Sequence, residues 1–187
     1  MKAVVIVDGL NLYHALEHFG PDATFLDIPS IAAQYLPKQR DEIEVFYFTS
    51  TPDHKGRATL DRHFEYLALL KSEKVEIIEG RFQRTVKKCI TCGAKSEIHK
   101  EKETDVSIAL KIIEAAMEAD TSEILLFSAD SDFAPALRFA RRVNPRVRLM
   151  VAQTSNFLRF SPNSLGAIAD SVVRLKAELI HTYSFRA

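Results

Sequence analysis

Aspartates stand at three junctions where an apolar segment gives way to a polar turn or to the start of a helix. They are Asp8, Asp105, Asp130 and Asp132. Like charges that are brought together repel one another unless something neutralises them. A hard divalent cation such as Mg²⁺ or Mn²⁺ prefers oxygen ligands, and water bound to it can become a nucleophile. If the fold brings these carboxylates together, the pattern predicts a metal site suited to the hydrolysis of phosphodiester bonds.

Each of these aspartates also has a structural interpretation. An aspartate that begins a helix, as expected of Asp105 and Asp132, commonly caps that helix or balances its dipole. Asp8 differs, because we expect a carboxylate at the end of a fully apolar central strand to be poorly placed for capping. Taken together, the four acids favour the metal site over four separate caps.

Short apolar runs, several of them rich in β-branched residues, alternate with segments of helical periodicity. We expect strands at residues 3–7, 43–49, 75–78, 124–128 and 147–152. After a first helix that begins near Asn11, we expect helices at residues 29–36, 57–72, 105–119, 132–142 and 165–171. This alternation is typical of an α/β fold with a mainly parallel central sheet. Ligands bind such sheets at the carboxyl ends of the strands, where Asp8 and Asp130 are expected to lie.

The composition favours one domain spanning residues 1–187 with an insertion at about 81–100. With 47% of its 187 residues hydrophobic, the chain can bury a core, and no apolar stretch approaches the roughly 20 residues of a membrane span. We therefore expect a cytoplasmic protein with no membrane partner. Twenty-five basic residues balance 25 acidic ones, so a globally basic nucleic-acid binder is excluded and only local patches could serve.

Two basic patches stand out from this balanced background. The first is the polar, basic stretch 81–100, which we predict to be an inserted hairpin or loop. The second is residues 138–148, which contain five arginines and no acid. Such residues could hold a phosphate backbone beside an acidic site, although a solvated surface explains them equally well. The candidates for nucleic-acid contacts are Arg81, Arg84, Lys87, Lys88, Lys102 and Arg138.

Both cysteines of the chain, Cys89 and Cys92, lie in this insertion as Cys-x-x-Cys. Two thiolates at that spacing form half of a structural zinc site, which needs four ligands. His99 is a possible third ligand, and His54 or His63 could supply the fourth. Because there is no second cysteine pair, zinc is possible but not favoured. A disulfide framework is not expected either, and a reducing compartment fits best.

Three motifs together resemble the signature blocks of the NYN domain family, which belongs to the PIN-like nucleases. They are VDGLNLY at residues 7–13, EKETDVSIA at residues 101–109 and SADSDFAP at residues 128–135. The blocks occur in the order seen in the family, and the resemblance covers essentially the whole chain. It implies a PIN-like three-layer α/β/α fold with a central, mainly parallel sheet.

The resemblance also implies which residues carry the chemistry. Asp8, Asp105, Asp130 and Asp132 would form the acidic metal site. Asn11 would lie beside the first aspartate, and Ser128 would orient ligands or water in the turn. The implied activity is an Mg²⁺- or Mn²⁺-dependent nuclease, more readily endonucleolytic than exonucleolytic, with RNA favoured over DNA as substrate. A homodimer is conceivable, because PIN-like domains often pair.

Two other function classes remain open at this point. One is a non-catalytic RNA-binding or regulatory protein that retains the fold. The other is a phosphatase or nucleotide hydrolase, since a metal-binding aspartate after the first strand would serve that chemistry too. Phosphatases of the haloacid dehalogenase type use an Asp-x-Asp pair there, whereas Asp8 is followed by Gly9 and Leu10. The missing second acid disfavours that class.

Overall fold

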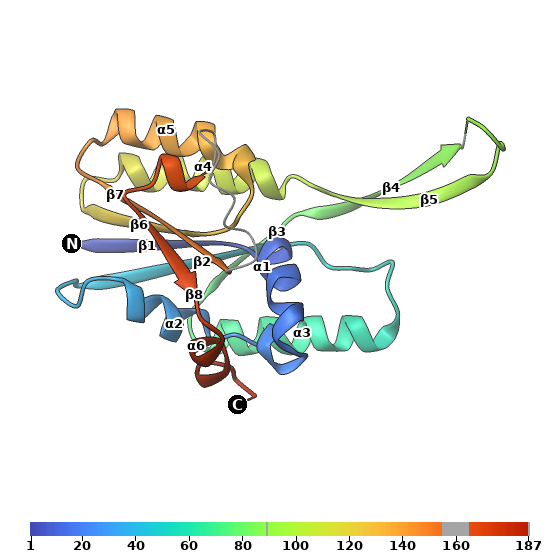
Figure 1. The fold of residues 1–187 in the computed structure, drawn as a ribbon, viewed down its shortest axis with the longest axis horizontal. Coiled ribbons are helices and arrows are strands. Elements are labelled where there is room, and N and C mark those ends of the chain that lie inside the picture. The colour runs from blue at the N-terminus through green and yellow to red at the C-terminus, as the bar shows by residue number, and fades with distance from the viewer. Residues whose placement is uncertain (89, 155–164, 187) are drawn as a thin grey trace.

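The computed structural model describes residues 1–88, 90–154 and 165–186 (Figure 1). Its central sheet has six strands in the order β3-β2-β1-β6-β7-β8, and every neighbouring pair is parallel. The strands are β1 (Lys2–Asp8), β2 (Glu42–Thr49), β3 (Glu76–Glu79), β6 (Thr121–Phe127), β7 (Arg148–Thr154) and β8 (Ser171–Leu175). The expected α/β fold with a mainly parallel sheet is confirmed.

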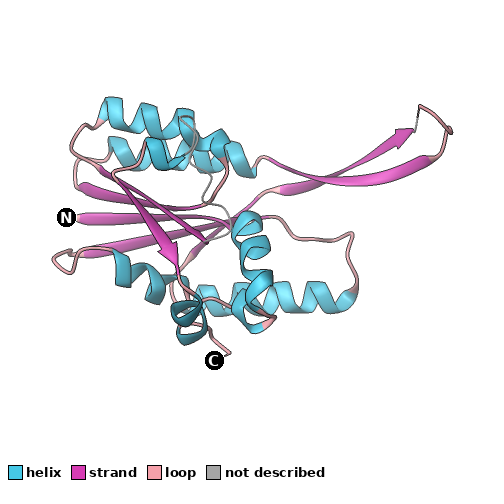
Figure 2. Cartoon of the chain, in the orientation of Figure 1, coloured by secondary structure: helices cyan, strands magenta, loops and turns pink. Residues whose placement is uncertain are grey.

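Helices cover both faces of this sheet and make the fold three-layered (Figures 1 and 2). On one face lie α4 (Thr104–Met117) and α5 (Ala134–Val143), and on the other lie α1 (Gly9–Leu16), α2 (Ile28–Tyr35), α3 (Arg57–Ser72) and α6 (Ala177–Thr182). Short 3-10 turns occur at residues 17–19, 22–24, 131–133 and 165–167. Among the described residues, no helix is long and apolar enough to cross a membrane.

The central strand β1 explains why its sequence is apolar without alternation. Val5 and Val7 point into the core on the side of α1, α2 and α3, whereas Val4 and Ile6 point into the core under α4 and α5. Each of these side chains is at most 1% exposed. Burial of a valine or isoleucine contributes about 1.5–3 kcal/mol, so both cores hold β1 firmly in place. The carboxyl end of β1 is therefore a rigid base for the residues that follow it.

The insertion at about 81–100 forms a separate two-stranded antiparallel hairpin, with β4 (Arg81–Lys88) and β5 (Lys95–Lys102). The hairpin projects away from the body of the molecule as a long arm (Figures 1 and 2). Most of its residues are exposed on both faces. Cys89, which follows Lys88 in the sequence, lies outside the described residues.

Three sequence expectations need correction. The helix expected at 165–171 is only a 3-10 turn at Leu165–Ala167, and Ser171–Leu175 forms the edge strand β8, because its β-branched residues pair with β7. Helix α6 was not expected. The helical periodicity of residues 105–119 predicts that Val106 and Met117 pack on the sheet with the other apolar residues of that face, but both are exposed on α4. Helical periodicity predicts an apolar stripe but not how wide a part of it the sheet can cover.

Candidate functional site

Asp8 lies at the carboxyl end of β1, directly beside the end of β6. The last paired residues of these strands are Val7 and Phe127, so Asp8 and Ser128 leave the sheet side by side. The Ser128 Oγ donates a hydrogen bond to the Asp8 Oδ2 over 3.1 Å, and the Asn11 backbone N–H donates to the Asp8 Oδ1 over 3.1 Å. Asp8 therefore caps α1, contrary to the expectation that it is poorly placed for capping.

A chain of hydrogen bonds extends from Asp8 through the turn after β6. The Asn11 Oδ1 accepts from the Ala129 N–H over 3.0 Å, and the Ser128 Oγ accepts from the Asp130 N–H over 3.0 Å. Asp130 in turn caps the 3-10 turn, because its Oδ1 accepts from the Asp132 N–H over 2.9 Å. Asn11 and Ser128 thus couple the two strand ends, and the positions of three carboxylates depend on them.

Asp8 is only 6% exposed, and its environment penalises the charged form. Burial raises the pKa of Asp8 from its ordinary value of 3.8 to about 6. The hydrogen bonds from Asn11 and Ser128 lower this pKa, while the negative charges of Asp105 and Glu101 raise it further. The net result is a buried carboxylate whose negative charge is only partly compensated.

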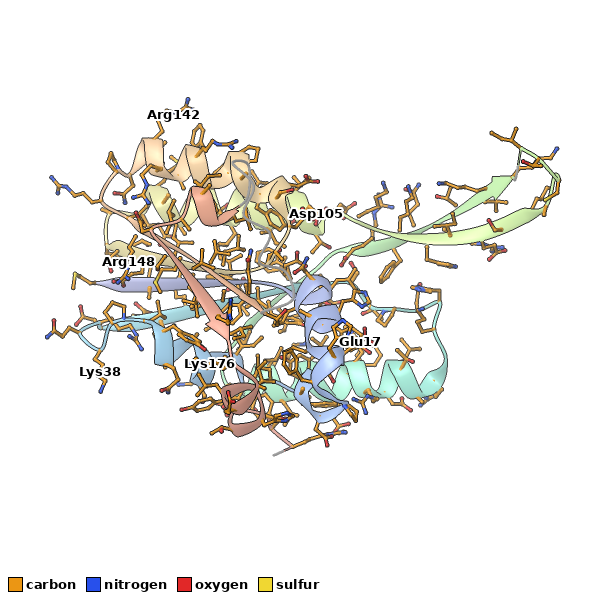
Figure 3. All side chains as sticks on the ribbon, in the orientation of Figure 1. Glu17, Lys38, Asp105, Arg142, Arg148 and Lys176 are labelled. Carbon is orange, nitrogen blue, oxygen red and sulfur yellow. The ribbon has the colours of Figure 1, made fainter. Side chains whose placement is uncertain are left out.

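Asp105 approaches the same region from the first turn of α4. Burial raises its pKa, and so do the negative charges of Asp130 and Asp132, which shows that these three carboxylates influence one another. In Figure 3, Asp105 lies at the end of the body from which the hairpin projects. Within the described residues, none of the four aspartates forms an ion pair with lysine, arginine or histidine.

This donor set fits a hard divalent cation. The carboxylates repel one another, are paired with no basic side chain in the described ranges and supply only oxygen ligands. In the part of the chain that the structure describes, no group of three or more histidine, cysteine, aspartate or glutamate side chains is close enough to hold a metal by itself. Mg²⁺ is commonly bound through one or two carboxylates and several waters, so it does not require such a group.

Glu101 belongs to the same region, although the sequence did not single it out as a site residue. Its Oε1 accepts a hydrogen bond from the Thr104 Oγ1 over 3.0 Å, and the Thr104 hydroxyl lies 3.4 Å from the Ser50 Oγ. The charge of Glu101 contributes to the raised pKa of Asp8 and of the buried Tyr47. In the sequence, Glu101 is one of several alternating charges before α4 and carries no signal that distinguishes it.

Two glycines allow the elements of this region to approach closely. A Cβ at Gly9 would lie 2.6 Å from the Phe48 carbonyl oxygen and 2.6 Å from the Tyr47 Cζ, so only glycine lets α1 begin directly beside β2. A Cβ at Gly80 would lie 2.4 Å from the Thr104 Oγ1. The glycine after Asp8 is therefore required by packing.

The predicted nucleic-acid contacts occupy different environments. Arg81 and Lys102 are paired at the base of the hairpin, and the Arg81 Nε donates to the Glu103 Oε1 over 2.6 Å. Further out, Arg84 forms an ion pair with Glu97, while Lys87 and Lys88 are exposed.

The second basic patch is not adjacent to the aspartates. Arg138 is exposed on α5. Arg142 and Arg148 lie at the end of the molecule opposite Asp105 (Figure 3). Arg141 forms an ion pair with Asp170 and so has a structural partner.

The cysteine motif is only partly described. Cys92 is exposed and free, whereas Cys89 is outside the described residues. His99 stacks on His54 with ring centroids 4.2 Å apart, at the base of the hairpin. Within the described ranges no cluster of three metal-ligand side chains includes Cys92, His54, His63 or His99. The zinc site stays a prediction.

The family model described as the NYN domain matches residues 2–173. Among solved structures, a protein of unknown function from Vibrio parahaemolyticus, VPA0982, is similar with a TM-score of 0.61 and 18% sequence identity over 94% of this chain and 93% of that chain. Phosphofructokinase-2 from Escherichia coli in complex with potassium gives a TM-score of 0.34 and 11% identity over 80% of this chain and 42% of that chain. No curated protein matches the chain. The first of these structural similarities shows a shared fold.

Proposed function

Because the chain belongs to the NYN domain family of PIN-like nucleases, we propose that it is an Mg²⁺- or Mn²⁺-dependent hydrolase that cleaves phosphodiester bonds inside RNA. The observation that carries this proposal is the buried Asp8, whose two oxygens are held by Ser128 and Asn11 beside other uncompensated carboxylates. A protein that only binds RNA gains nothing from a carboxylate cluster that repels the phosphate backbone.

Asp8, Asp105, Asp130 and Asp132 would hold the metal ion, directly or through water. When bound, the ion would supply a water nucleophile at neutral pH and neutralise charge that develops on the phosphate and the leaving oxygen. Burial raises the pKa of Asp8 and of Asp105, and neither carboxylate forms an ion pair with a basic side chain among the described residues. A divalent cation is the simplest group that provides a positive partner.

The other residues of the site position these acids. Ser128 donates to the Asp8 carboxylate and accepts from the Asp130 N–H, so one hydroxyl joins Asp8 to the backbone of the turn that carries Asp130. Asn11 ties the start of α1 to the turn after β6 through the Ala129 N–H. Substitution of either residue would leave polar groups without partners in a partly buried place, at about 1–3 kcal/mol for each group.

The substrate is proposed to be RNA, held beside the carboxylates by basic side chains. Arg81 and Lys102 are the predicted contacts at the base of the hairpin, next to the start of α4, which carries Asp105. Further out on the hairpin, Lys87 is exposed and would contact a flanking phosphate, whereas Arg84 is already paired with Glu97.

Cleavage of a circular RNA and of matched linear RNA and DNA tests the proposal. The protein is stripped of metal with EDTA and resupplied with Mg²⁺, Mn²⁺ or Ca²⁺. We expect linear products from the circle with Mg²⁺ or Mn²⁺, and none with the Asp105→Asn variant, which is partly exposed and should fold normally. Metal binding is measured separately by isothermal titration calorimetry, since that signal does not depend on turnover.

The outcomes separate the three function classes. No cleavage of any nucleic acid, with intact metal binding and RNA binding, would contradict the nuclease and favour a non-catalytic RNA-binding protein. Release of phosphate from p-nitrophenyl phosphate or a nucleotide, without cleavage of RNA, would favour a phosphatase. Cleavage of linear RNA but not of the circle would show an exonuclease.

A further inference from the structure

The two faces of the β4–β5 hairpin differ in charge. Residues that pair across an antiparallel ladder share a face, and neighbouring residues in a strand point to opposite faces. By the observed register, one face carries Arg81, Gln83, Thr85, Lys87, Ser96, Ile98, Lys100 and Lys102. We call it the Lys100 face. It has four cations and no acid.

The opposite face, which we call the His99 face, is mixed in charge and partly engaged. It carries Phe82, Arg84, Val86, Lys88, Lys95, Glu97, His99 and Glu101. The ion pair between Arg84 and Glu97 lies on this face and confirms the assignment of residues to it. Phe82 and His99 also pack against the ring of His54, with ring centroids 4.7 Å and 4.2 Å apart, so its base is covered.

The Lys100 face borders the start of α4, whose first turn carries Asp105. Arg81, Gln83 and Lys102 line a groove of about 560 Å³ whose other wall is formed by Glu103, Val106 and Ser107. That wall belongs to the N-cap and first turn of α4, the turn on which Asp105 also lies. A nucleic-acid strand that extends from Asp105 along this groove would contact the Lys100 face.

The chemistry of the Lys100 face suits a phosphate backbone and not bases. Lys87, Lys100 and Lys102 are exposed and form no ion pair among the described residues, so they are available to phosphates. The face has no aromatic side chain on which a base could stack, because Phe82 and His99 point to the other side. Lysine and arginine contacts to phosphates position a strand without reading its sequence.

We propose that the Lys100 face binds the sugar–phosphate backbone of the nucleic-acid substrate on one side of the cleavage position. The proposal rests on the proposed function, since the bound strand is its substrate. Each hairpin strand has eight residues and so spans about 27 Å, the length of about eight nucleotides at roughly 3.4 Å each. The protein therefore prefers substrates that extend at least about eight nucleotides beyond the cut on that side, regardless of sequence.

Two double variants with equal loss of charge test which face binds. Lys87→Gln with Lys100→Gln removes one lysine per strand from the Lys100 face, and Lys88→Gln with Lys95→Gln does the same on the His99 face. All four side chains are exposed, so both variants should fold, which circular dichroism checks. Binding of a fluorescein-labelled 30-nucleotide RNA is measured by anisotropy in EDTA, from 50 to 200 mM KCl.

We expect a slope of log affinity against log salt near −2 for the wild type, from the three available lysines at about 0.7 each on a single strand. The Lys100-face variant should lose about 1.4 of this slope and bind about 10–30-fold more weakly at 100 mM KCl. The His99-face variant should change by less than about threefold, because its lysines point away from the strand. Equal losses in the two variants would overturn the proposal.

Substrate length gives an independent readout in the cleavage assay. Linear RNAs with 4, 8 or 12 nucleotides on either side of a mapped cut are compared. We expect kcat/KM to rise about tenfold up to about eight nucleotides on one side in the wild type, and to be independent of length in the Lys100-face variant. If kcat/KM is independent of flank length and equal in the wild type and both double variants, the hairpin proposal is refuted and the proposed nuclease activity is not. If only the Lys100-face variant binds RNA more weakly but no RNA is cleaved, the nuclease activity is refuted and the hairpin proposal is supported.

Discussion

Replacing Asp8 by asparagine should stabilise the metal-free protein while it abolishes cleavage. Burial raises the pKa of Asp8 from 3.8 to about 6, and each pKa unit corresponds to about 1.4 kcal/mol, so ionised Asp8 costs about 3 kcal/mol at pH 7.5. Asparagine removes this cost and keeps an oxygen that accepts from the Asn11 N–H. Its NH₂ group can donate to the Ser128 Oγ, but the second N–H and the Ser128 O–H, which loses its acceptor, then lack partners and cost about 1 kcal/mol each.

The expected net gain is therefore about 1 kcal/mol at pH 7.5. For a chain of 187 residues this corresponds to a rise in Tm of about 2–4 °C. The gain should fall as the pH is lowered, because protonation of Asp8 removes the penalty in the folded state between about pH 6 and pH 4. Near pH 4 the variant should be less stable than the wild type, because the cost of the two unpartnered donors remains.

Urea unfolding in EDTA, followed by circular dichroism at pH 7.5, 6 and 4, measures this difference in the free energy of unfolding. Asp27→Asn is the matched control, since Asp27 caps α2 by accepting from the Ser30 N–H as Asp8 caps α1. Asparagine and aspartate are equivalent caps, so the control should change by less than about 0.5 kcal/mol. An Asp8→Asn variant that is less stable than the wild type at pH 7.5 would refute the reasoning.

Two further substitutions test the packing and the charges of the fold. Gly80→Ala should destabilise the protein by about 1–3 kcal/mol in urea unfolding, because the new Cβ would lie 2.4 Å from the Thr104 Oγ1. Gly56→Ala is the control, because the space around Gly56 is open, and it should not destabilise the protein in this way. Equal effects of the two substitutions would contradict the packing argument. Burial alone would raise the pKa of Asp170, but hydrogen bonds from Arg141 and the backbone lower it below its usual value. The wild type should therefore be more stable than Asp170→Asn at pH 6, and this advantage should disappear as the pH falls below about 4. If the difference in the free energy of unfolding does not vary with pH, the ion pair of Asp170 does not account for it.

Local patterns predicted much of the sheet and most of its helices. The apolar runs at 3–7 and 124–128 are strands because a central parallel strand is buried on both faces and must be apolar throughout. The strand at 171–175 was not predicted, because its apolar run is short and follows the segment 165–171, which was expected to be a helix. Only pairing with β7 makes it a strand, and pairing is a long-range property.

The candidate site was foreseen in its residue types but not in its connections. Strand ends and motif blocks pointed to Asp8 and Ser128, yet the hydrogen bond between them depends on β1 and β6 being neighbours in the sheet. Glu101 was not foreseen, because it reaches the region of Asp8 only through the contact of the hairpin base with Thr104. No spacing in the sequence encodes that contact.

The basic hairpin shows where local information ends. Its sequence alone determined that residues 81–102 are polar, basic and unsuited to a core, and hence that they must lie on the surface. Which cations act together was decided by the tertiary structure. The pairing of Arg84 with His99 sets the register, and a shift by one residue would redistribute the lysines between the two faces. Charge composition is a property of the chain, whereas a charged face exists only once the strands have paired.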